Sequence, residues 1–236
     1  MFYIDWTYII LVMPAVIFSM WASARVNTTF ERYSKQNSAR RMTGAEAASR
    51  VLRANGIYDV KIERIKGNLT DHYDPKANVI RLSEVVYDSV STAAIGVAAH
   101  EAGHAVQHAQ NYAPVKIRTA IVPITNIGSK LSIPLVIVGL LLSYLGPQYA
   151  AIAYAGVAAF GLCVVFQLVT LPTEFNASKR ALVAIEQCGI LSSDELEGSK
   201  KVLSAAALTY VAALAVTLMQ FLRLFLLVAG SSNRRR

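Results

Sequence analysis

The sequence predicts a mainly α integral membrane protein with about four transmembrane helices and one small α+β module. Two features of its composition indicate this class. Hydrophobic residues make up 54% of the 236 residues and charged residues only 16%, whereas about a quarter of an ordinary soluble domain is charged. The apolar residues also occur in blocks, many of them close to the roughly 20 residues that cross a bilayer as a helix. Polar segments separate these blocks.

The charge balance fits a membrane protein better than a nucleic-acid-binding one. The formal net charge is +8, but the basic residues flank apolar blocks and do not interleave with aromatic residues. We therefore expect no nucleic-acid partner. Cys163 lies in an apolar block and Cys188 in a polar one. Because the sequence has no C-x-x-C pair, we interpret both as free thiols.

Residues 1–21 predict a transmembrane signal-anchor helix. Residues 4–21 hold a single charge, Asp5, close to the start of the apolar run. A secretory signal peptide would carry basic residues before that run. Here they follow it, at Arg25, Arg32, Lys35, Arg40 and Arg41. Because basic residues favour the cytoplasmic side, we expect the N-terminus outside and the next segment in the cytoplasm.

Residues 22–113 predict a cytoplasmic α+β module. A capping box, Thr43-Gly-Ala-Glu46, begins an amphipathic helix. Residues 58–65 alternate with a period of two and predict a half-buried strand, and residues 78–83 predict a second short strand. The intervening residues 71–75 are rich in turn formers. An exposed edge of such a sheet can bind an extended peptide by strand addition.

The remaining apolar blocks predict three further membrane helices. Residues 114–171 contain an amphipathic lead-in and two transmembrane helices, with Lys130 interrupting the first apolar block. Residues 172–201 are polar and predict a cytoplasmic helical segment. Residues 202–236 predict a C-terminal membrane helix with a basic tail at residues 234–236.

Counting the crossings places the module and residues 172–201 on the same, cytoplasmic face, so they can share a site. The same count places the basic tail outside, against the positive-inside preference. Two explanations stay open for this conflict. Either the last helix does not fully cross the bilayer, or the short tail is an exception to the rule.

A zinc-binding motif lies in the module. His100-Glu-Ala-Gly-His104 matches H-E-x-x-H, and the small, proline-free residues before it predict a helix capped by Ser91. Residues four apart on a helix nearly share one face, about 6 Å apart along the axis, so both imidazoles can bind one Zn²⁺. Glu101 points beside this pair, where a general base is needed.

A catalytic zinc ion needs a third protein ligand, and several residues are candidates. His108 lies about 12 Å along a straight helix from His100, too far for all three motif-region histidines to bind one ion. His72, in the predicted turn, could approach the site, although a loop hydrogen bond is its simpler role. Carboxylates on the same membrane face are better candidates. Glu174 is favoured among them because it directly follows a transmembrane span.

Two protein families resemble this chain at these residues. His100-Glu-Ala-Gly-His104 followed by Glu174-Phe-Asn-Ala-Ser178 is similar to the signature of the HtpX-type and CAAX-processing membrane metalloproteases, which are gluzincins. This resemblance implies that Glu174 is the third zinc ligand. Those families carry an aspartate where this chain has Ser178, so the role of that position in orienting a zinc ligand is not carried over.

The chain resembles the YugP-type family of neutral zinc metallopeptidases more closely, over nearly its whole length. The segments that carry this resemblance are Leu69-Thr-Asp-His-Tyr-Asp-Pro75, Ala99-His-Glu-Ala-Gly-His-Ala105, Tyr112-Ala-Pro114, Leu171-Pro-Thr-Glu-Phe-Asn-Ala-Ser178 and Ala205-Ala-Ala-Leu-Thr-Tyr-Val-Ala212. The resemblance implies a multi-pass bacterial membrane zinc peptidase. Together with the topology, it predicts a zincin-like catalytic module on the cytoplasmic side of the inner membrane. It does not name a substrate.

The expected reaction is hydrolysis of peptide bonds in membrane or membrane-proximal proteins. Glu101 would take a proton from the zinc-activated water and pass it to the leaving amine. His72 and Tyr210 are candidates for stabilising the oxyanion. The expected cofactor is Zn²⁺, and the expected partners are protein or peptide substrates and the lipid bilayer.

An alternative from another class is a non-catalytic membrane adaptor or scaffold that contains a structural zinc ion. Two observations oppose it. Structural zinc sites usually have four protein ligands, often cysteines, and no cysteine lies near the motif. Glu101 would also have no purpose in such a site. A zinc hydrolase that acts on another substrate, such as a lipid, has no sequence feature in its favour.

Overall fold

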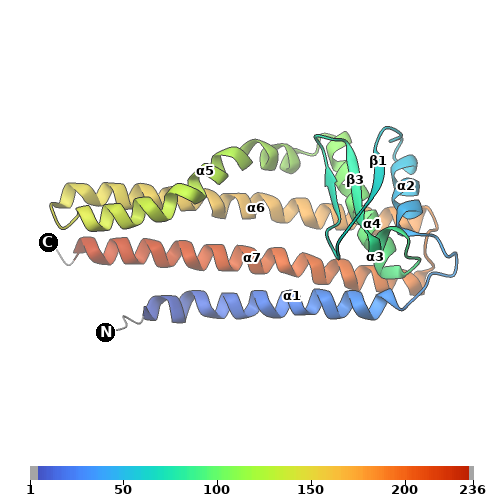
Figure 1. Ribbon diagram of the computed structural model, residues 1–236, viewed down its shortest axis with the longest axis horizontal. Coiled ribbons are helices and arrows are strands. Elements are labelled where there is room, and N and C mark those ends of the chain that lie inside the picture. The colour runs from blue at the N-terminus through green and yellow to red at the C-terminus, as the bar shows by residue number, and fades with distance from the viewer. Residues whose placement is uncertain (1–4, 234–236) are drawn as a thin grey trace. The chain divides into compact units, whose positions relative to one another are not determined.

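The computed structural model describes residues 5–233, which are mostly helical (Figure 1). The chain divides into two compact units. The membrane unit comprises Met1–Trp21, Ile117–Leu171 and Tyr210–Arg236, and the polar unit comprises Ala22–Lys116 and Pro172–Thr209. The predicted basic tail at residues 234–236 and the first four residues of the predicted signal-anchor lie outside the described residues.

Four helical segments within the described part of the chain are long and apolar enough to cross a membrane, as the sequence predicts. They are Tyr8–Ser34, Ala113–Leu142, Pro147–Gln187 and Ser193–Ser231. The first joins a short π-helix, η1 (Tyr8–Val12), to α1 (Met13–Ser34). The second is α5 (Ala113–Leu142), the third joins η2 (Pro147–Tyr149) to α6 (Ala150–Gln187), and the fourth lies in α7 (Ser193–Asn233).

These helices do not end where their apolar blocks end. The polar residues after Leu171 continue α6 without a break, and the apolar residues after Lys201 continue α7 from its start at Ser193. Lys130 does not interrupt α5 either. A change from apolar to polar side chains therefore does not end these helices, because the backbone hydrogen bonds continue past it.

Small residues allow α5 and α6 to pack closely in the membrane unit. A Cβ atom added at Gly139 would lie 2.2 Å from the Ala153 backbone nitrogen, and one added at Gly156 would lie 2.7 Å from the Ser132 carbonyl oxygen. Glycine is the residue that permits such backbone approach between membrane helices. A small apolar core, formed by Val136, Ala153, Val157, Leu224 and Val228, also includes α7.

The membrane unit also contains an ion pair between distant parts of the chain. Arg223 on α7 donates a hydrogen bond from Nε to Asp5 Oδ2 at 2.9 Å, and its guanidinium lies 5.3 Å from the centre of the Tyr8 ring. Charged groups within membrane helices are costly unless they are paired. Asp5, the single charge of the first apolar block, is therefore paired with Arg223, the single charge within the last apolar block.

A three-stranded sheet lies in the polar unit, with the strand order β1-β3-β2 (Figure 1). The strand β1 (Lys61–Ile65) runs parallel to β3 (Val79–Ser83), and β2 (His72–Asp74) runs antiparallel to it at the edge. The strands β1 and β3 confirm the two strands predicted at residues 58–65 and 78–83. The prediction of a turn at residues 71–75 was wrong for the three residues of β2, because so short a strand has no recognisable alternation.

Two helices of the polar unit, α2 and α4, begin at predicted caps. In α2 (Gly44–Ala54), the Thr43 hydroxyl accepts a hydrogen bond from the Glu46 backbone N–H, and the Glu46 carboxylate accepts one from the Thr43 N–H. The short α3 (Glu84–Tyr87) follows β3. The motif helix α4 (Thr92–Ala109) is capped by the Ser91 hydroxyl, which accepts from the Ala94 N–H. Each cap satisfies an amide that would otherwise lack a partner.

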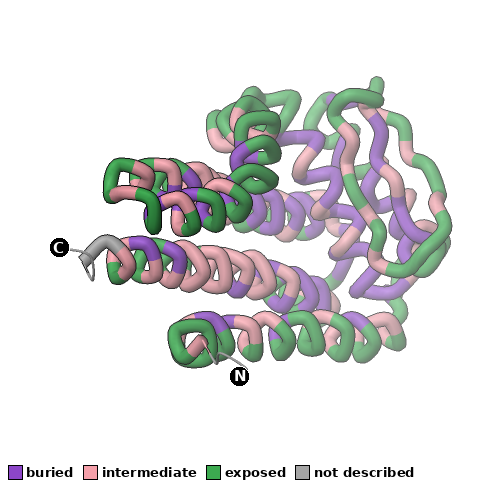
Figure 2. Tube along the Cα trace, turned by 60° about the vertical axis from the view of Figure 1, so that its left-hand side comes forward, coloured by how far each residue is buried: buried purple, intermediate pink, exposed green. Residues whose placement is uncertain are grey.

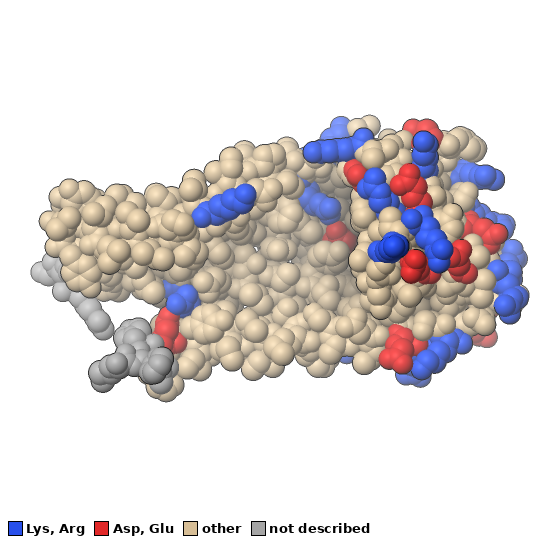
Figure 3. Space-filling view, in the orientation of Figure 1, with Lys and Arg blue, Asp and Glu red and all other residues tan. Residues whose placement is uncertain are grey.

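The core of the polar unit surrounds α4. The buried residues, shown in purple in Figure 2, include one full side of this helix: Ala94, Ile95, Ala98, Ala99, Ala102 and Val106. On the face seen in Figure 3, the acidic and basic side chains gather over the polar unit, and the long apolar helices are almost free of them. The polar unit therefore has a water-exposed surface around a helix that is itself almost fully buried.

Candidate metal centre

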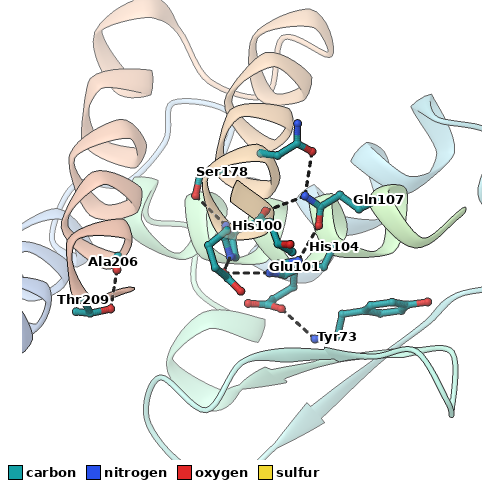
Figure 4. Close-up of polar contacts among 11 residues, drawn as sticks. Tyr73, His100, Glu101, His104, Gln107, Ser178, Ala206 and Thr209 are labelled. Atoms are coloured by element: carbon teal, nitrogen blue, oxygen red, sulfur yellow. Dashed lines mark hydrogen bonds and ion pairs between the residues drawn. The ribbon is translucent and has the colours of Figure 1, made fainter. Parts of the chain in front are cut away.

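Two histidines of α4 and one glutamate of α6 converge in the polar unit. His100 and His104 project from the same side of α4, with ring centroids 4.7 Å apart (Figure 4). Glu174 Oε2 lies 3.3 Å from His100 Nε2 and 3.4 Å from His104 Nε2. Within residues 5–233 this is the one group of three side chains whose ligand atoms, all within 4.8 Å of one another, could hold a metal ion.

The spacing of these atoms fits a zinc ion. Tetrahedral bonds of about 2.0–2.2 Å separate neighbouring ligand atoms by about 3.3–3.6 Å, and the two nitrogen–oxygen distances are 3.3 and 3.4 Å. The donors, two imidazoles and one carboxylate, match a known type of catalytic zinc site, which leaves a fourth position open. The side chains are largely shielded, with 13%, 16% and 5% exposure for His100, His104 and Glu174.

A glycine allows α4 and α6 to come close enough for this convergence. A Cβ atom added at Gly103 would lie 2.7 Å from the carbonyl oxygen of Ala177, so the two helices meet backbone to backbone there. Ala177 and Ala181 of α6 are fully buried in this contact region. Gly103 is also the residue before His104, and small side chains on both helices thus bring Glu174 to the histidines.

Each histidine has a polar partner on its other ring nitrogen. Ser178 Oγ lies 3.1 Å from His100 Nδ1, and Gln107 Oε1 lies 3.0 Å from His104 Nδ1 (Figure 4). Such partners orient metal-binding imidazoles and fix which nitrogen faces the metal. Ser178, which stands where related signatures carry aspartate, therefore still contacts His100. Gln107 was not predicted, although its position three residues after His104 places it on the adjoining part of the same helix face.

The surroundings of His104 raise its pKa above the ordinary value of 6.5. Burial alone would lower this pKa. The hydrogen bond to Glu174, the negative charges of Glu101 and Glu174, and the contact with Gln107 together outweigh burial. In the metal-free site, His104 therefore holds a proton more strongly than an exposed histidine does.

Glu101 is held by the edge strand of the sheet. The residue is only 8% exposed, and its Oε2 accepts a hydrogen bond from the Tyr73 backbone N–H at 2.9 Å (Figure 4). The start of β2 is itself fixed by Asp71, whose Oδ1 accepts from the Ser83 N–H at 2.7 Å. Burial raises the pKa of Asp71, hydrogen bonds from Ser83 oppose this, and the charge of Glu101 adds to the rise.

The other predicted site residues do not join the three-residue group. His72 lies on β2 rather than in a turn, with an exposed ring whose Nδ1 is 2.9 Å from the Thr70 carbonyl oxygen. His108, which the helix geometry excludes as a ligand, packs its ring edge against Tyr73 at 6.1 Å. Tyr210 lies on α7 in the membrane unit, so its predicted role stays a prediction.

Four membrane-length helices and a histidine–glutamate centre on an H-E-x-x-H helix are the features of a membrane zinc peptidase. Comparison with known proteins agrees with this class. Residues 8–229 match the family described as "Putative neutral zinc metallopeptidase", and the chain belongs to this family. The predicted resemblance is confirmed.

A relative from Bacillus subtilis (strain 168) supports the same assignment. It is described as "Putative membrane protease YugP" and is 46% identical over 216 residues, which cover 92% of this chain and 94% of the relative. No solved structure matches the chain. The similarity therefore spans most of both chains.

Proposed function

We propose that this protein is a gluzincin-type peptidase that hydrolyses peptide bonds of membrane or membrane-proximal proteins. His100, His104 and Glu174 hold Zn²⁺, and Glu101 is the general base. The observation that carries this proposal is the convergence of three ligand atoms beside a buried glutamate, with both nitrogen–oxygen distances at the spacing of a tetrahedral site. We propose further that the polar unit is a zincin-like module on the cytoplasmic side of a bacterial inner membrane.

The residues around the centre divide the chemistry between them. A bound zinc ion supplies Lewis acidity, which polarises a peptide carbonyl and lowers the pKa of water to about 7. The Tyr73 N–H holds Glu101 Oε2 in place, so Oε1 is the oxygen that takes the proton of the attacking water. The same carboxyl then gives this proton to the leaving amine. His72 and Tyr210 remain candidates for stabilising the oxyanion.

The edge strand β2 suits the binding of an extended substrate. It has only one neighbour in the sheet, β3, and its Tyr73 N–H points to Glu101 on α4. A peptide that paired with this edge would lie next to the general base, because main-chain pairing sets the position of a strand relative to its neighbour. This arrangement favours a peptide substrate over a lipid.

The test is a comparison of membranes that contain wild-type protein, Glu101→Gln or Glu197→Gln. Glutamine is nearly isosteric with glutamate but cannot accept the proton, so cleavage by Glu101→Gln should fall by about 10²–10⁴-fold while bound zinc persists. Glu197, an exposed residue of α7 paired with Lys201, provides the matched control and should behave as wild type. Quantitative proteomics of the membrane fraction would report the peptides that change.

Two results would contradict this function. One is a Glu101→Gln protein that matches wild type in every cleavage that wild type performs. The other is a Glu101→Gln protein that has lost its zinc, since this would make Glu101 a ligand and the site structural. The second result would favour the adaptor or scaffold alternative.

A further inference from the structure

We infer that Gln107 is a positioning residue of the zinc centre, which fixes the proton of His104 on Nδ1 and so directs the Nε2 lone pair to the metal. This inference rests on the proposed function, because it assigns a role in holding the same ion. It concerns a residue outside the H-E-x-x-H motif and outside the ligand set. The atoms around Gln107 differ in whether they can donate hydrogen bonds or only accept them, and this difference fixes the orientation of its amide.

Gln107 has three polar neighbours and no exposure to solvent. Its side chain is fully buried, at 0% exposure. The Nε2 amide nitrogen donates to the Thr173 carbonyl oxygen at 2.8 Å and to Asn176 Oδ1 at 2.9 Å, and Oε1 lies 3.0 Å from His104 Nδ1 (Figure 4). All the hydrogen-bonding groups of the amide are therefore engaged by the protein.

The direction of these hydrogen bonds is determined by an arginine at the far end. Arg180 Nε donates to Asn176 Oδ1 at 2.7 Å, and a guanidinium can only donate. Asn176 must therefore present its oxygen, not its amide nitrogen, at this point. The Thr173 carbonyl can likewise only accept. Both neighbours thus require a donor, so the amide nitrogen of Gln107 faces them.

The remaining atom of the amide, Oε1, then faces His104 and can only accept. His104 Nδ1 must carry a hydrogen to complete that contact, and in the neutral imidazole the lone pair is then on Nε2. Nε2 is the nitrogen that lies 3.4 Å from Glu174 Oε2. The chain of contacts from Arg180 to His104 thus selects the tautomer that binds a metal ion.

On the Nδ1 side, the partner of His100 has no fixed hydrogen-bond direction. Its Nδ1 contacts Ser178 Oγ, and a hydroxyl can rotate to donate or to accept. Gln107 also connects α4 to Thr173, the residue immediately before Glu174. One buried side chain therefore orients one ligand and contacts the backbone next to another.

The test compares zinc dissociation constants of the detergent-solubilised full chain in wild type, Gln107→Leu and Gln107→Glu. Gln107→Leu removes the acceptor for His104 and should weaken zinc binding by about 10–100-fold, as loss of a ligand's outer partner typically does. Gln107→Glu retains an acceptor for Nδ1–H and should bind zinc more tightly than Gln107→Leu. Gln187→Leu, the same change at an exposed residue at the end of α6, should leave the constant unchanged.

The thermal stabilities of the zinc-free variants should follow the opposite order. Glutamate places a carboxyl group against the oxygens of Thr173 and Asn176, whereas leucine suits a buried position. A side chain needed only for packing would give the same order in both measurements, with leucine better than glutamate in each. The positioning role is supported if Gln107→Glu binds zinc more tightly than Gln107→Leu while Gln107→Leu is the more stable of the two zinc-free proteins.

A spectroscopic measurement on wild type keeps the inference testable even if Gln107→Leu fails to fold. The chain has only four histidines, so ¹⁵N spectra of histidine-labelled, zinc-loaded protein can resolve each ring. We expect His104 to be protonated at Nδ1 and to bind through Nε2. Binding through Nδ1, or an unchanged zinc constant in Gln107→Leu, overturns the inference and leaves the proposed function intact. A wild-type protein that binds no zinc contradicts both.

Discussion

Glu174 is the proposed ligand whose assignment depends most on tertiary structure, because it lies on a different helix from the two histidines. Purified wild-type protein should contain one zinc ion per chain. Glu174→Ala and His100→Ala should each lose most of it, since each removes one of only three protein ligands. Glu186→Ala, an exposed change on the same helix α6, is the control and should keep its zinc. Elemental analysis of purified protein measures the content.

A normal zinc content in Glu174→Ala would point to another third ligand. His72 would then be the first residue to test, because β2, on which it lies, contacts α4 through Tyr73 and Glu101.

The raised pKa of His104 predicts that zinc affinity depends on pH. Above that pKa the imidazole is neutral, and zinc binds without displacing a proton from it. Below that pKa one proton must leave before Nε2 can bind, so the apparent affinity should fall by up to about tenfold for each unit of pH. Because the pKa lies above its ordinary value, this loss should begin at a higher pH than an isolated histidine would give. Chelator competition at a series of pH values measures it, and a constant affinity throughout would contradict it.

Among the structural elements, the contact of α4 with α6 is the one that Gly103 makes possible. Gly103→Ala would place a methyl group 2.7 Å from the Ala177 carbonyl oxygen, so the helices must separate. Such overpacking typically costs about 1–3 kcal/mol, and the unfolding midpoint should fall together with zinc affinity. Gly230→Ala is the control, because a Cβ atom there meets nothing within 4 Å and alanine favours helices. Equal stability of the two variants would contradict this account.

The predictable elements are those that local chemistry specifies. The capping box of α2, the Ser91 cap of α4 and the pair of histidines four residues apart follow from short stretches of sequence, and the structure has each of them. The short strand β2 was missed because three residues are too few to show a period. Gln107 was missed because two of its three partners lie elsewhere in the chain: Thr173 is 66 residues away and Asn176 is 69. A contact of that kind leaves no local pattern in the sequence.

The molecule as a whole is expected to have its N-terminus outside and the polar unit in the cytoplasm. Five basic residues follow the first apolar block within about 20 residues, the range over which positive charge sets orientation. In a chain with Cys163 and Cys188 replaced by serine, Lys76→Cys and Ser193→Cys should resist a membrane-impermeant thiol reagent added from outside. Tyr144→Cys, at a 79% exposed residue between α5 and α6, should react and serves as the control. External labelling at Lys76→Cys or Ser193→Cys would reverse the orientation.

Because the proposed ligands come from two distant segments, a bound metal ion would cross-link the chain as well as take part in the reaction. His104 and Glu174 are about 70 positions apart, and α5 and the first part of α6 lie between them in the chain. A bound ion therefore closes a ring of polypeptide that includes two membrane-length helices, as a disulfide would, but it can be opened by a chelator or by protons. At a free zinc concentration 100 times the dissociation constant, this closure contributes about 2.7 kcal/mol to the folded state. A cell that runs short of zinc would thus hold a protein that is easier to unfold and degrade, so metal supply could set the amount of the peptidase together with its activity.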